Sequence, residues 1–141
     1  MTKLQDFESH IKIKLSAIWG SVMSLYIYCD YFQLYTPGKL QAMLAGTTIF
    51  GKGDQLILLG LSTFMLVTSL MICASILMPA KLNKWLNIFV GVVMTVFLAI
   101  LAFKAGYYYY KVYAVVESLL TFYIVWLAWQ WPKQTENEVT P

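Results

Sequence analysis

The chain has 141 residues, of which 60% are hydrophobic and only 12% are charged. Soluble domains carry roughly 45–50% apolar and about 25% charged residues, so this composition excludes an ordinary soluble domain and indicates an integral membrane protein of one domain. All ten basic residues are Lys, and the formal charge is +3. Because these lysines lie mostly in flanks and loops, we expect them to contact lipid headgroups rather than nucleic acid.

Four long apolar segments follow a short N-terminal segment. In residues 1–14 the apolar side chains share one helical face, which predicts an amphipathic lead-in helix on the membrane surface. The apolar segments cover about 15–35, 55–78, 85–103 and 107–131, and each is close to the roughly 20 residues that cross about 30 Å of hydrocarbon. Residues 132–141 form a polar tail that we expect to be disordered.

The connections between these segments predict how the helices are arranged. Only Thr36–Asp54 is long; its apolar middle predicts a short interfacial or re-entrant segment, and Asp54 is placed to cap the second helix. The other two connections, 79–84 and 104–106, are tight turns. Short connections make consecutive helices antiparallel neighbours. The predicted fold class is therefore all-α: a four-helix transmembrane bundle with up-down-up-down topology.

The orientation follows from the lysines near the span ends. The side that holds both termini has six lysines against four on the other side, which favours both termini in the cytoplasm, with the protein in the cell inner membrane. Aromatic residues near both ends of the predicted spans are typical of membrane-interface belts. These are Trp19, Trp85, Trp129 and Trp131 on the terminal side, and Tyr31, Tyr35 and Tyr107–Tyr110 on the other.

Glu117 is the most unusual residue, because it lies inside the fourth apolar segment. An acid at that depth costs several kcal/mol, roughly 2.5–3.5 for the related Asp on insertion scales, and desolvation favours its neutral form. Asp30 lies in the same half of the membrane, about one to two helical turns nearer the surface. We therefore predict a ligand pocket in that half. Its expected lining residues are Asp30, Glu117, Tyr26, Tyr113 and Tyr110.

Structural roles for the same residues are open alternatives. Asp30 could simply be solvated near the interface, and a protonated Glu117 bonded to a tyrosine hydroxyl would serve as a link between helices. Helical periodicity also assigns a polar or small inward face to the other two spans. That face is Ser62, Ser69 and Cys73 in the second span, and Asn87, Gly91 and Met94 in the third.

Several chemistries are disfavoured by what the sequence contains. His10 is the only histidine and lies outside the spans, so we expect no haem, di-iron or zinc site and no cofactor. Cys29 and Cys73 form no C-x-x-C pair, which argues against a thiol-disulfide enzyme. With no histidine base near its serines, the chain is not expected to be a serine hydrolase.

Four short motifs, spread over nearly the whole chain, are similar to the pattern of one family. They are Tyr28-Cys29-Asp30, Asn83-Lys84-Trp85-Leu86-Asn87, Glu117 and Ala128-Trp129-Gln130-Trp131-Pro132. The chain resembles small bacterial four-span membrane proteins that are classed only as a domain of unknown function. The resemblance implies the fold and the topology but no activity. Lys84 stands where that family usually has Arg, which weakens any bidentate phosphate contact there.

Three functions from different classes remain open. The first is binding or transport of a proton, cation or other small ligand through the acidic pocket, for which a homo-oligomer is expected. The second is a structural or accessory subunit that packs against another membrane protein. The third, ranked last for want of a nucleophile with a base, is an enzyme acting on a lipid or quinone.

Overall fold

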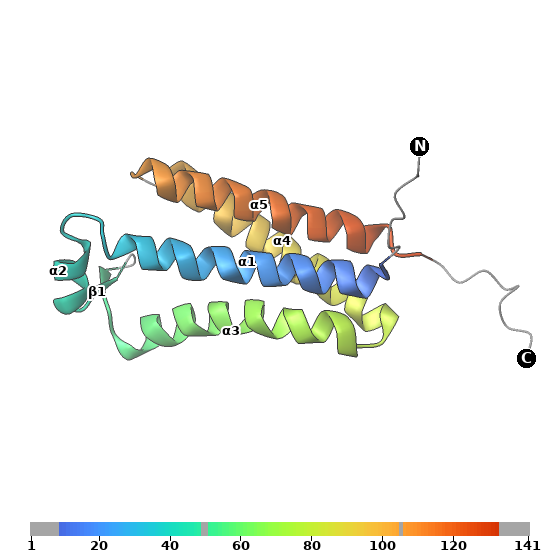
Figure 1. The fold of residues 1–141 in the computed structure, drawn as a ribbon. Coiled ribbons are helices and arrows are strands. Elements are labelled where there is room, and N and C mark those ends of the chain that lie inside the picture. Colours follow the sequence, from blue (N-terminus) through green and yellow to red (C-terminus); the bar gives the residue numbers. More distant parts are fainter. Residues whose placement is uncertain (1–8, 49–50, 105, 133–141) are drawn as a thin grey trace, which may run out of the picture.

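The computed structural model describes residues 9–48, 51–104 and 106–132, and these residues are almost entirely helical (Figure 1). The order of the elements is α1 (Ile11–Gln33), α2 (Lys39–Leu44), β1 (Thr47–Thr48), β2 (Gly51–Lys52), α3 (Gln55–Leu77), α4 (Ala80–Lys104) and α5 (Tyr108–Trp129). The two strands form an antiparallel hairpin in which Thr47 pairs with Lys52. The all-α prediction is confirmed, with this hairpin as a small addition.

Three of the long helices, α3, α4 and α5, are long and apolar enough to cross a membrane. Helix α1 also has 23 residues, but it is not among these candidate spans. Its serines, its polar aromatic residues and Asp30 lower its hydropathy. By length and composition, the described residues therefore hold three spans rather than the four predicted.

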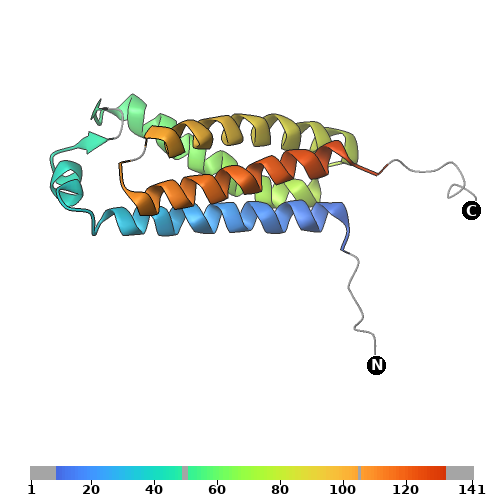
Figure 2. The same cartoon turned by 90° about the horizontal axis from the view of Figure 1, so that it is seen from above.

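The four long helices lie side by side with alternating direction (Figures 1 and 2). Helix α4 packs closely along α5, and α1 lies between α3 and α5. The beginning of α1 and the end of α5 are at one end of the bundle, and α2 with the hairpin is at the other. The buried core consists of Leu15, Trp19, Val22, Tyr26, Met71, Val90, Met94, Leu98 and Ile124.

The turn between α3 and α4 is shorter than predicted, because α4 begins at Ala80 rather than at Trp85. Met78 is extended, with φ −76° and ψ 151°, which is the conformation that a residue before proline favours. Pro79 then accepts a hydrogen bond from the Asn83 N–H at 2.9 Å and starts the helix, a position where its missing N–H is not needed.

The long connection contains α2 and the hairpin. None of the α2 residues is buried, so this segment lies at the surface of the bundle rather than inside it. The cap predicted for the next helix is confirmed, because the Asp54 side chain accepts a hydrogen bond of 2.9 Å from the Ile57 N–H. Most of the predicted lead-in, residues 1–8, and residues 133–141 of the predicted tail lie outside the described residues. Residues 11–14 form the first turn of α1.

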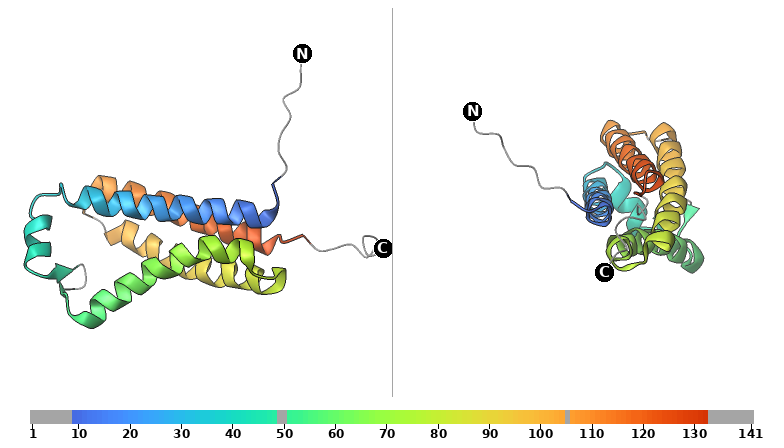
Figure 3. Two further views of the ribbon diagram at one scale, coloured as in Figure 1. Left: turned by 60° about the horizontal axis from the view of Figure 1, so that its bottom comes forward. Right: turned by 90° about the vertical axis from the view of Figure 1, so that its right-hand side faces the viewer.

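Helix α3 diverges from the other long helices toward its N-terminal end (Figure 3). Its buried residues, Thr68, Met71 and Ser75, all lie in its C-terminal half. Only 11% of its apolar window is buried, against 28% for α4 and for α5. The N-terminal half of α3 therefore lines an open space instead of a packed core.

The close packing of α4 against α5 depends on Gly91. A Cβ atom at this position would lie 2.7 Å from Val125 Cγ2 and 3.4 Å from the Thr121 carbonyl oxygen. In Gly91→Ala protein we expect a lower melting temperature in detergent, because overpacking costs typically about 1–3 kcal/mol. Gly60→Ala is the matched control, since nothing lies within 4 Å of that Cβ. Adding Val125→Ala should restore part of the loss, and equal melting temperatures for both alanine variants would contradict this account.

Candidate functional site

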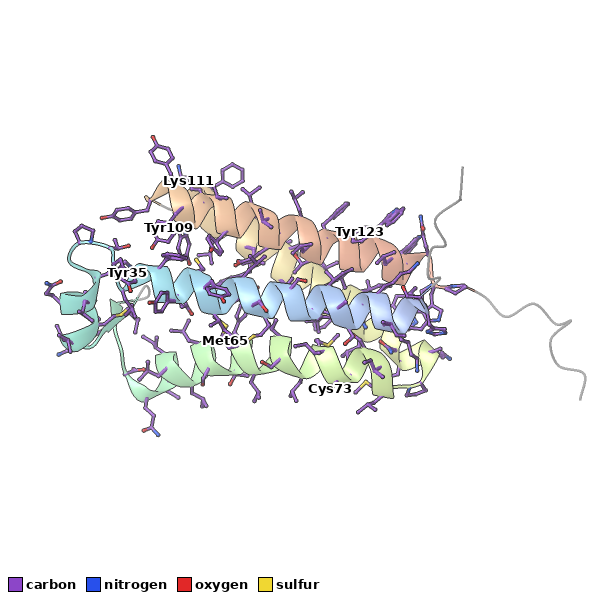
Figure 4. All side chains as sticks on the ribbon, in the orientation of Figure 1. Tyr35, Met65, Cys73, Tyr109, Lys111 and Tyr123 are labelled. Atoms are coloured by element: carbon purple, nitrogen blue, oxygen red, sulfur yellow. The ribbon has the colours of Figure 1, made fainter. Side chains whose placement is uncertain are left out.

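A cavity of about 1120 Å³ lies between the long helices, at the end of the bundle that carries α2 and the hairpin. Its wall is mostly apolar and comes from α1, α3, α4 and α5, with α2 and the hairpin at one side. Met65 is one of the lining residues, and Figure 4 shows it on α3. The cavity occupies the space that the divergence of α3 leaves.

Glu117 is the polar residue placed deepest in this cavity wall. It lies on the buried face of α5, formed by Ala114, Glu117, Thr121, Ile124 and Ala128, and only 3% of it is exposed. Its main-chain carbonyl accepts a hydrogen bond of 3.0 Å from Thr121 Oγ1. Its carboxyl oxygen Oε1 is buried and has no hydrogen-bond partner among the described residues. The site therefore presents an unpaired acceptor next to an open space.

Asp30 lines the same cavity but in a different environment. Its side chain is exposed, and Oδ1 accepts a hydrogen bond of 2.9 Å from Gln33 Nε2. Gln33 itself is buried, so it holds the Asp30 carboxyl in place. Lys39 of α2 also lines the cavity and brings a positive charge to it.

The tyrosines divide into two groups. Tyr26 and Tyr110 line the cavity with the two acids, whereas Tyr113 is half-buried and does not line it. The Tyr26 hydroxyl donates to Met94 Sδ at 4.0 Å rather than to a carboxyl. Four of the five proposed site residues thus meet at one cavity, and their role in binding a ligand stays a prediction.

A second group of buried polar residues lies at the opposite end of the bundle, and the sequence did not reveal it as a network. Asn87 Oδ1 accepts from Trp19 Nε1 at 2.7 Å and from Ser75 Oγ at 3.3 Å. Asn87 Nδ2 donates to Asn83 Oδ1 at 2.6 Å, and Asn83 Nδ2 donates to the Ser75 carbonyl at 2.6 Å. The spacing of the two asparagines, four residues apart and so on one helical face, was the available signal.

This network corrects one prediction about the aromatic belts. Trp19 is fully buried and serves as a hydrogen-bond donor in the core, so it is not an interface residue. Trp85 and Trp129 are exposed, as a belt requires. An indole N–H in hydrocarbon needs a protein acceptor, and Asn87 provides it.

The prediction for the inward face of the second span is only partly right. Thr68, Met71 and Ser75 are buried, whereas Ser62 and Cys73 are exposed and Ser69 is half-buried. Two of the predicted residues nevertheless face the bundle, because Ser62 lines the cavity and Ser69 Oγ donates to Met23 Sδ of α1 at 3.4 Å. Cys29 is buried and Cys73 is exposed, and both are free thiols. In the third span, the predicted inward residues Asn87, Gly91 and Met94 are buried.

Fold and site together define a helical multi-pass membrane protein with two acidic side chains in an internal cavity. The chain belongs to a family of unknown function, DUF6326, whose match covers residues 2–138. Comparisons with curated proteins and with solved structures give no match. The family description agrees with the expected family of unknown function, and it states neither a membrane location nor a bacterial origin.

Glu117 and Asn87 are both buried polar residues, and their replacement by apolar residues of similar size should have opposite effects. Glu117→Met removes an unpaired acceptor, so we expect a higher melting temperature in detergent. Asn87→Leu leaves the Trp19 N–H without its acceptor, which should cost about 1–3 kcal/mol. Thermal unfolding of the two variants beside the wild type measures both effects. A loss of stability in Glu117→Met comparable to that in Asn87→Leu would mean that Glu117 is bonded within the protein.

Proposed function

We propose that this chain is a four-span membrane protein that binds a small ligand, a proton or a cation, in the acidic cavity, and that this binding serves transport or sensing. The observation that carries the proposal is that Glu117 lines the cavity while its Oε1 has no hydrogen-bond partner among the described residues. An acceptor buried without a donor costs about 1–3 kcal/mol, and more when it is charged. A ligand that brings a donor or a positive charge removes this cost.

The contrast with the asparagine network strengthens this interpretation. Asn83 and Asn87 are fully buried, and both side chains are bonded, which is typical of a structural role. Glu117 is also buried, but no donor among the described residues bonds its Oε1. Unpaired intramembrane acids are typical of substrate and ion sites.

The four-span topology is also part of the proposal. Buried residues run along the whole of α1, from Leu15 to Gln33, and α1 packs against both α3 and α5. A 23-residue helix measures about 35 Å at 1.5 Å per residue. If α3 and α5 cross the bilayer, α1 crosses beside them. The lysine count then favours both termini in the cytoplasm, and with them the cavity in the outer half of the membrane.

The two alternative functions have less support. In an accessory subunit Glu117 would link the helices of the bundle, and its Oε1 has no such bond to any of the described residues. An enzyme acting on a lipid or quinone could use the apolar cavity, but the described residues of the cavity lining include no histidine to serve as a base. We therefore rank ligand binding first.

The topology can be tested with single cysteines in a Cys29→Ala, Cys73→Ala background. Lys14, Gln41 and Gln130 are exposed, so each can be replaced by cysteine and labelled with a membrane-impermeant maleimide in intact cells. We expect Gln41→Cys to react from outside, and Lys14→Cys and Gln130→Cys to react only after permeabilisation. Labelling of Lys14→Cys from the same side as Gln41→Cys would show that α1 does not cross the membrane.

Ligand binding can be tested by thermal stabilisation of the purified protein with sodium, potassium, methylammonium and larger organic ammonium salts. Binding to the folded state adds about 2.7 kcal/mol to the free energy of unfolding at a ligand concentration of 100 times Kd. The melting temperature rises as a result. At least one of these cations should stabilise the wild type and have no effect on Glu117→Gln, which keeps the shape of the side chain. Stabilisation of both proteins alike, or of neither protein by any of these salts, would refute cation binding in the cavity.

A further inference from the structure

The size, lining and charge of the cavity specify a class of ligand. We infer that it holds an amphiphilic amine, whose ammonium group donates an N–H to Glu117 and whose apolar body lies along the N-terminal half of α3. This inference rests on the proposed function and narrows it. Three features of the cavity carry it.

The first feature is the volume of the cavity. One water molecule takes up about 30 Å³ in the liquid. An inorganic cation with its hydration shell needs no more than a few such volumes. The cavity measures about 1120 Å³, which is slightly above the roughly 300–1,000 Å³ typical of sites for drug-sized molecules. No three His, Cys, Asp or Glu side chains of the described residues gather into a metal site. The space fits an organic molecule.

The second feature is the apolar and aromatic wall. On the α3 side it includes Ile57, Leu61 and Met65. Phe64 of α3 lies with its ring centroid 4.8 Å from that of Phe97 of α4 and 6.0 Å from that of Tyr26 of α1, and all three rings line the cavity. A chain of rings between three helices offers faces and edges to an apolar or aromatic body. The wall therefore favours a ligand that is mostly hydrophobic.

The third feature is the charge of the lining. Asp30 and Glu117 bring two carboxyls and Lys39 brings one ammonium, so the fully ionised lining has one negative charge in excess. A ligand with a single positive charge neutralises it. The Glu117 carboxyl, whose Oε1 has no donor among the described residues, can accept from an ammonium N–H, whereas a quaternary ammonium provides charge alone. The polar head of the ligand is therefore expected to carry at least one N–H.

A matched series of compounds separates these features. Phenylbutylamine has an apolar body and N–H donors, its trimethylammonium analogue keeps the charge without them, phenylbutanol is neutral, and methylammonium lacks the body. Binding to the wild type and to Glu117→Gln is measured by isothermal titration calorimetry in phosphatidylcholine nanodiscs, with nanodiscs that hold no protein as the reference for partition into lipid. Phenylbutylamine should bind, and Glu117→Gln should weaken its binding about 10- to 100-fold, as expected for loss of a charged hydrogen bond.

The other three compounds should bind more weakly than phenylbutylamine by about tenfold or more, since each lacks one matched feature. Phe64→Leu should weaken the binding of phenylbutylamine more than the binding of methylammonium. If methylammonium or sodium binds as tightly as phenylbutylamine and also depends on Glu117, the amphiphilic class is wrong while the proposed function stands. If the alcohol binds as tightly as the amine, the charge is irrelevant and the inference fails. If Glu117→Gln weakens the binding of none of these cations, the proposed binding of a cation by Glu117 itself fails.

An ammonium on an apolar body occurs both in free amines and in aminophospholipids. Repeating the titration in nanodiscs that contain phosphatidylethanolamine distinguishes the two sources. Competition by this lipid in the wild type but not in Glu117→Gln assigns the site to the lipid headgroup. Unchanged binding assigns it to a free amine, and either result keeps the ligand class.

Discussion

Inside a bilayer no water satisfies a polar group, so each buried donor and acceptor of this bundle must find its partner in the protein or in a ligand. At one end of the bundle this requirement is met. Trp19, Ser75, Asn83 and Asn87 bond one another across three helices. At the other end it is not met, because Glu117 Oε1 has no partner among the described residues. This difference separates a structural polar cluster from a candidate site.

The packing of the helices explains why the two ends differ. Gly91 lets α4 approach α5 closely, and α1 fills the space between α5 and α3 with Trp19, Val22 and other core residues. Helix α3 is buried only along its C-terminal half, beside the asparagine network. Toward its other end it diverges, as Figure 3 shows, and a cavity forms. The network thus holds the C-terminal half of α3 in the bundle. Glu117 lies toward the other end, where α3 has no buried residues.

The sequence predicts the helices well, because each needs about 20 apolar residues and ends at Gly, Pro or polar residues. It also indicates that Glu117 and Asp30 lie in the same half of the bundle, since depth follows from residue count. It does not predict the tilt of α3 or the hydrogen bonds of Trp19. Both depend on side-chain packing between helices that are far apart in the chain. For the same reason the sequence does not identify Thr68, Met71 and Ser75 as the buried residues of α3.

The central claim is that the Glu117 carboxyl faces an accessible apolar cavity rather than a packed interface. Dicyclohexylcarbodiimide tests this most directly, since it reacts with carboxylic acids in apolar surroundings and leaves a stable N-acylurea. Mass spectrometry of the folded, membrane-embedded wild type should locate this adduct on Glu117. If Glu117 stays unmodified in the folded protein but reacts after denaturation, it is enclosed by protein, and the account of the cavity is contradicted.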